Sequence, residues 1–189
     1  TITKSPKVVY MPSFARGLGQ PVDLMDGAGI PISINDASGL RSIKIAFDFA
    51  PENLTVANKD SVSLSANLKS AGWKIDGSSL DATKGVLTVS VSGSVDLPTS
   101  STGTELLRIK ASVPNKATFK QGEALGLSAT GLSKTGAPVE IRNSTAIQKV
   151  ALLGDVDGDG TFSLNDSLQL RRVIAKKISG FSDYATTEP

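Results

Sequence analysis

Three aspartates at every second position, Asp155, Asp157 and Asp159, are the residues of this sequence best placed to do chemistry. A loop that curls round an ion turns alternate side chains inward, and a hard cation needs several oxygen ligands at about 2.3 to 2.6 Å. Gly160 follows, where an EF-hand loop makes its sharp turn. The spacing predicts a calcium site, and the alternative is an acidic turn that only faces solvent. The predicted ligands, with Thr161 offering its carbonyl oxygen, are Asp155, Asp157, Asp159, Thr161, Ser163 and Asp166.

The segment after this loop has helical spacing. Apolar residues fall at Leu170, Val173, Ile174 and Ile178, and Gly180 fits a helix stop. We therefore predict that residues 153–189 form a small calcium-binding loop-helix unit. Because clustered carboxylates repel one another, we expect the loop to be poorly ordered without calcium. The preceding region ends with hardly any linker, so we also expect the two parts to touch.

Residues 1–152 have the period-two pattern of strands with one wet face. In Ser42–Phe49, Gly85–Ser92 and Thr104–Val113, apolar residues alternate with polar ones. Glycine and proline turn signals separate these runs. We predict a mainly β fold, a sandwich of about nine strands of the jelly-roll or immunoglobulin-like sort. The further expected strands are Lys7–Met11, Ile30–Asn35, Leu54–Val56, Trp73–Asp76, Leu125–Leu132 and Ala146–Leu152.

Composition disfavours several classes of function. The chain has no histidine and no cysteine, which removes imidazole bases, thiolate metal sites and disulfides, so we do not expect an enzyme. A formal charge of +2 gives no reason to expect a nucleic-acid partner. No stretch approaches the roughly 20 apolar residues of a membrane span. The first residue is Thr1 rather than Met, which suggests a processed or excised piece.

The stretch from Gly154 to Asp166, followed by Leu168, Leu170 and the pair Arg171-Arg172, resembles one repeat of a type I dockerin. Aspartate at position twelve, Asp166, is what that family has where an EF-hand has glutamate. The resemblance implies that the loop binds calcium and docks a cohesin. It covers one repeat, whereas the family has two. The positions that resemble dockerin contact points are Leu164, Asn165, Arg171 and Arg172; for the two arginines a solvated helix face is the alternative.

Residues from about 7 to 150 resemble a cohesin domain. The resemblance is carried by Ile30–Ile34, by Ser42–Phe49, and by the phrase Ala50-Pro51-Glu52-Asn53-Leu54. It implies a nine-stranded jelly-roll that holds a dockerin on one sheet face, as in cohesin-like units beside dockerins in large bacterial surface or secreted proteins. The sequence does not say which face.

Together these features lead us to expect a non-catalytic, calcium-binding protein-interaction module of an extracellular or cell-surface assembly. Its expected partner is a dockerin- or cohesin-bearing chain, including copies of itself joined head to tail. The alternative is a carbohydrate-binding sandwich with a structural calcium site. With one Trp and two Tyr in the chain, a sugar-stacking platform is hard to build. Carboxylate pairs for glycoside hydrolysis are a weaker alternative, because calcium already accounts for the dense acidic cluster.

Overall fold

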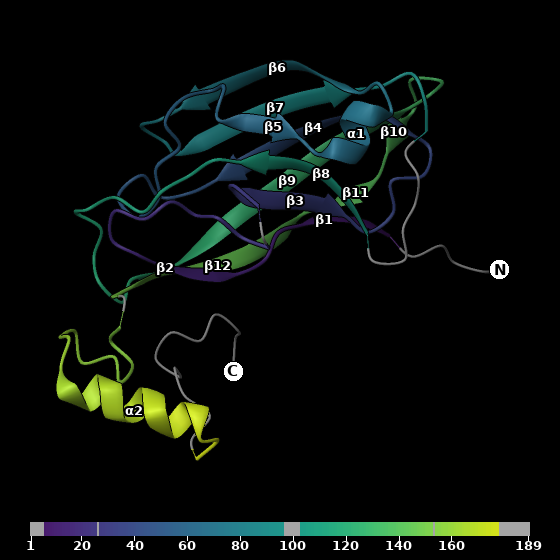
Figure 1. Ribbon diagram of the computed structural model, residues 1–189. Coiled ribbons are helices and arrows are strands. Elements are labelled where there is room, and N and C mark those ends of the chain that lie inside the picture. The colour runs from purple at the N-terminus through teal and green to yellow at the C-terminus, as the bar shows by residue number, and fades with distance from the viewer. Residues whose placement is uncertain (1–5, 26, 97–102, 153, 178–189) are drawn as a thin grey trace.

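The computed structural model describes residues 6–25, 27–96, 103–152 and 154–177. Its main body is two layers of β-strands, and a separate helix, α2, lies beyond one end of them (Figure 1). The mainly β sandwich expected from the alternating runs is confirmed. Among the described helices, none is long and apolar enough to cross a membrane.

One layer is a seven-stranded sheet with the order β2-β12-β9-β4-β7-β6, and β10 pairs with β9. Its neighbours are antiparallel except for β12 and β2, which run parallel. Its strands are β2 (Phe14–Gly17), β4 (Leu40–Asp48), β6 (Lys74–Asp81), β7 (Val86–Ser92), β9 (Gly122–Ser133), β10 (Pro138–Val139) and β12 (Ser144–Ala151).

The other layer is a five-stranded sheet with the order β11-β1-β3-β8-β5. A register shift between Ile32 and Ser33 of β3 inserts an extra residue, Leu106, into β8. Its strands are β1 (Lys7–Tyr10), β3 (Ile30–Ile34), β5 (Val62–Leu64), β8 (Thr104–Ile109) and β11 (Ile141–Arg142).

The core lies between the two sheets. In β4 the side chains of Ile43, Ile45 and Phe47 are buried, whereas Lys44 and Asp48 are exposed, as the alternation predicts. A short helix, α1 (Ala66–Ser70), packs Leu68 into this core. Its first turn is capped by Ser65, whose side-chain oxygen accepts a hydrogen bond from the Leu68 N–H at 3.3 Å.

The structure differs from the sequence-based prediction in its short elements. It has twelve strands in the described ranges instead of about nine, and β2, β5, β10, β11 and helix α1 were not predicted. The expected strand Leu54–Val56 is wrong, because only Thr55 pairs there, in an isolated bridge with Ser112. These elements contain two to five residues, which is too few to show a period.

The C-terminal unit leaves the sandwich from β12. Helix α2 (Leu164–Ile174) follows the acidic loop and lies at the end of the sandwich rather than on a sheet face (Figure 1). The helix was predicted to reach Ile178 and stop at Gly180, which lie outside the described residues. The half-buried ring of Phe119 reaches the loop at Gly160, so the expected contact between the two parts exists.

Candidate functional site

The acidic loop gathers three carboxylates. One oxygen from each of Asp155, Asp157 and Asp159 lies within 4.8 Å of the other two. Asp155 is only 2% exposed, and its two oxygens accept the N–H groups of Asp159, at 3.1 Å, and Gly160, at 3.0 Å. The loop backbone therefore curls round the Asp155 carboxylate, with its neighbours aimed at the same space. Closely spaced carboxylate oxygens are the donor set of a calcium-class cation.

Glycine makes this curl possible. Gly154, Gly158 and Gly160 have φ values of +88°, +71° and +89°, a region that a β-carbon disfavours. Gly160 stands where the spacing argument placed the sharp turn. The backbone in this loop thus agrees with the alternate spacing of the acids.

Asp166 occupies a different position from the other acids. Its carboxylate is 1% exposed and accepts the N–H of Val156 at 2.7 Å and the N–H of Ser163 at 2.7 Å. With the Ser163 hydroxyl, which caps α2, it forms a capping box. These hydrogen bonds lower the pKa of Asp166, and the bond from the Ser163 N–H has the largest effect. Asp166 closes the loop by joining its start to the first turn of the helix.

The remaining predicted ligands surround this centre. The hydroxyl of Thr161 donates to the Asp159 carboxylate at 2.7 Å. The Asn165 amide donates to the Asp157 carboxylate. The structure therefore brings Asp155, Asp157 and Asp159 together and ties Thr161, Ser163 and Asp166 to the same loop through hydrogen bonds.

The predicted partner-contact residues all lie on the surface of α2. Leu164 is 89% exposed, and Asn165, Arg171 and Arg172 are also exposed. Further large apolar side chains of this unit are uncovered. They are Phe162, Leu168, Leu170 and Ile174. Several exposed apolar side chains on one small unit, beside basic side chains, are typical of a contact surface.

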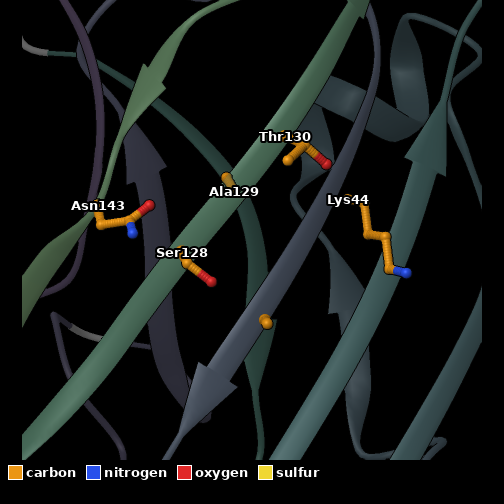
Figure 2. Close-up of a pocket in the computed structure, with 6 residues that line it drawn as sticks. Lys44, Ser128, Ala129, Thr130 and Asn143 are labelled. Carbon is orange, nitrogen blue, oxygen red and sulfur yellow. The ribbon is translucent and has the colours of Figure 1, made fainter.

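The outer face of the seven-stranded sheet is open and carries small side chains. Lys44 lies opposite Thr130 and Ala46 opposite Ser128 in the β4–β9 ladder. Figure 2 shows the labelled side chains of these strands around a shallow hollow of about 360 Å³. The lining residues are Lys44, Ala46, Ser128, Ala129, Thr130 and Asn143.

The five-stranded sheet is covered in part by the segment before β3. The bulge at Leu106 lets Glu105 and Arg108 meet, and their side chains pair at 2.9 Å. Arg108 also donates to the carbonyl of Leu24 at 2.9 Å, which holds the segment before β3 against this sheet. The outer face of the seven-stranded sheet, with the hollow beside Lys44, is the more open of the two.

The backbone arrangement matches solved structures of one family. The sixth cohesin of scaffoldin B from Acetivibrio cellulolyticus, solved in complex with a dockerin, superposes with a TM-score of 0.57 at 14% identity, covering 78% of this chain and 99% of that one. This chain has the cohesin fold. A non-cellulosomal cohesin from Archaeoglobus fulgidus also superposes, with a TM-score of 0.57 at 14% identity, covering 78% of this chain and 93% of that one. So does a cohesin module of a Clostridium perfringens family 33 glycoside hydrolase, with a TM-score of 0.58 at 12% identity, covering 78% of this chain and 98% of that one.

No protein-family model and no curated protein matches the sequence. The backbone arrangement shows the cohesin fold, at identities that leave few residues in common. The sequence did not reveal the open face of the cohesin fold. The sequence feature that could have indicated this face is the set of small outward residues on β4, β7 and β9, such as Ala46, Thr88 and Ser128. They can be assigned to one surface only when the order of the strands is known.

Proposed function

We propose that this chain is a non-catalytic protein-docking module that holds its partner on the outer face of the seven-stranded sheet. The observation that carries the proposal is the contrast between the two sheets. The outer face of β4, β7 and β9 offers small side chains and a hollow, whereas the segment joined to Arg108 lies against part of the five-stranded sheet. A flat surface of small residues lets a helix or a second surface approach closely.

The proposed partner is a protein with a dockerin-like module. Solved cohesins with this fold, from Acetivibrio cellulolyticus and other bacteria, hold dockerins in their complexes. Lys44 is the exposed cation beside the hollow, so we expect the partner to place an acidic or carbonyl oxygen there.

We propose further that the acidic loop binds calcium through Asp155, Asp157 and Asp159, with Thr161, Ser163 and Asp166 completing the site. The support is the distance of less than 4.8 Å among the three carboxylates and the burial of Asp155. Calcium would fix the start of α2, and with it the exposed surface that includes Leu164, Arg171 and Arg172. One chain would then carry a docking face and a docking helix, which allows head-to-tail contacts in an extracellular or cell-surface assembly.

The carbohydrate-binding alternative gains no support from the buried aromatic rings. Trp73 is 4% exposed, and its indole N–H donates to the carbonyl of Val95 at 3.1 Å. Phe47 and Phe49 stack on each other within the core. These rings are not available to stack on a sugar.

The docking face is tested by placing a large charged side chain on it. Ala46→Arg should abolish binding of calcium-loaded dockerins, measured by isothermal titration calorimetry across a panel of purified type I and type II modules. The control variant is Asp60→Arg, in an exposed loop. Glu105→Arg, on the five-stranded sheet, is a poor control because it would break the ion pair with Arg108. Binding that survives Ala46→Arg would move the docking site elsewhere. If no dockerin in the panel binds, the proposal of a dockerin-like partner is contradicted.

Self-assembly is tested on the whole chain. Sedimentation velocity should show larger species in calcium and monomer in chelator, and a double variant, Arg171→Glu with Arg172→Glu, should stay monomeric in both. A monomer at high concentration with saturating calcium would contradict head-to-tail assembly while leaving dockerin binding untouched.

A further inference from the structure

Strand β6 is the outermost strand at one end of the seven-stranded sheet. It pairs with β7 on one side, and within the described ranges no strand pairs with its other side (Figure 1). In an antiparallel pair, every second residue points its N–H and C=O groups away from the partner strand. An eight-residue edge of this kind can therefore accept another strand. The side chains along β6 decide which strand fits.

A bulge in β6 puts its two large apolar side chains on the same face. Ile75 and Leu80 are five residues apart, so in a regular strand they would point to opposite faces. The register shifts between Ile75 and Gly77, and with Asp76 as the extra residue both apolar side chains lie opposite buried residues of β7. The inward residues of β6 are Ile75, Ser78 and Leu80, and the outward ones are Lys74, Gly77, Ser79 and Asp81.

Two copies of β6 match each other in one antiparallel register, centred on Ser78. Across that centre Leu80 meets Ile75 of the second copy on the inward face, and Asp81 meets Lys74 of the second copy on the outward face. A register shifted by one position would set inward residues against outward ones. A shift by two positions would leave a charged end without its partner. A parallel pair would place each charge beside the same charge of the other copy, which is unfavourable.

The charged ends of β6 are exposed and only loosely engaged. The Lys74 side chain is 76% exposed, and its nitrogen lies 3.8 Å from the Asp76 carboxylate. The Asp81 side chain is 46% exposed; its Oδ1 accepts two N–H groups of the following turn, and its Oδ2 lies 3.8 Å from the nitrogen of Lys84. Opposite charges and apolar pairs directly across two antiparallel strands stabilise the pairing. A bulge usually blunts an edge, but a strand with the same bulge keeps the faces matched.

We propose that β6 is a homodimerisation edge, at which two copies of this chain pair β6 with β6 about a two-fold axis through Ser78. The interface is isologous, so each contact occurs twice. One pair of strands makes a small interface, so we expect a weak dimer that forms at higher concentration than the calcium-dependent assembly. The dimer does not rest on the proposed docking function. Where that function holds, the dimer sets two docking faces side by side on one continuous sheet.

The test uses the full chain in chelator, where calcium-dependent assembly is absent. Sedimentation equilibrium from micromolar to millimolar chain should show a monomer–dimer equilibrium. Lys74→Asp leaves two acids at each outward contact and Asp81→Lys leaves two cations, so each variant alone should dimerise roughly tenfold more weakly. An equimolar mixture of the two variants restores opposite charges at both contacts and should dimerise as the original chain does. Lys59→Asp, the same charge reversal in an exposed loop, is the control and should change nothing.

A monomer at millimolar concentration would overturn the proposal. So would a dimer that Lys74→Asp leaves unchanged, or one that Lys59→Asp weakens equally. A mixture that dimerises no better than its components would show that positions 74 and 81 do not meet.

Asp81→Lys also removes an acceptor from the turn before β7, so a second variant is needed where it folds poorly. Ile75→Asp places an acid across from Leu80 of the second copy and should weaken the dimer by a similar factor; an unchanged dimer would contradict the register. None of these measurements contains a dockerin, so their failure would leave the proposed docking function untouched.

Discussion

The ring of Phe119 lies against Gly160, so close that a β-carbon on Gly160 would stand 3.1 Å from the ring atom Cε1. Phe119 belongs to the turn before β9, and Gly160 to the acidic loop. This contact joins the loop to the sandwich at a point where the backbone also has a φ of +89°. Two independent constraints, space and backbone angle, thus require glycine there.

Gly160→Ala should weaken calcium binding by the loop roughly tenfold, because a non-glycine residue at positive φ costs about 1 to 3 kcal/mol. Calorimetric titration with calcium measures the change. Gly136→Ala is the matched control, since its φ is +77° but no atom lies within 4 Å of the added carbon and it is far from the loop in sequence. Equal calcium affinities for the two variants would contradict the assigned role of Gly160.

Removing calcium should loosen the C-terminal unit and leave the sandwich folded. Asp155→Ala, or a chelator, removes the carboxylate round which the loop curls, so residues 154–180 should become sensitive to protease. Trypsin has cleavage sites there at Arg171, Arg172, Lys176 and Lys177. Limited proteolysis followed by mass spectrometry should release this segment and retain the strands. Equal resistance with and without calcium would count against a calcium-ordered unit.

Glu123 should make the protein less stable as the pH rises. Burial raises its pKa in the folded state above the value near 4.3 of an unfolded chain. A carboxyl with a raised folded pKa contributes stability that is fully present below the unfolded value and is lost as the pH rises through the folded value. Urea unfolding across this range, compared with Glu123→Gln, isolates the effect. Parallel pH profiles for the two proteins would show that Glu123 does not titrate in this way.

Ser65→Ala should lower the free energy of unfolding by about 1 kcal/mol, because it removes the cap of α1. The helix is short and holds Leu68 in the core, so the loss should appear in the unfolding of the whole sandwich. Urea denaturation measures it. Ser63→Ala, two residues earlier in β5, should change stability by less than half as much, and an equal loss would mean that the cap does not act.

The alternating runs were enough to predict the central strands. In β4 each inward residue of Ile43, Ile45 and Phe47 is followed by an outward one, and this pattern survives folding because one face of the sheet meets the core. The two-residue strand β11 pairs with the distant β1, whereas β10 pairs with β9 across the turn at residues 134–137, and both are too short to show a period. Nothing local in their sequence could reveal them.

The acidic loop and the contacts between strands divide in the same way. The spacing of Asp155, Asp157 and Asp159 places them together because the loop is local, and the structure brings them within 4.8 Å. The position of Gln148 opposite Glu123 depends on which strands become neighbours. A polar residue at an inward position of an alternating strand was the available signal, and its meaning required the three-dimensional arrangement.

The parallel pairing of β12 with β2 has a mechanical consequence. The C-terminal unit is attached directly to β12, which is held by β2 on one side and by β9 on the other. Tension applied to that unit pulls β12 along its own length, so the hydrogen bonds of both ladders are loaded together in shear instead of opening one by one. A tether built in this way should resist pulling far better than one whose hydrogen bonds open singly.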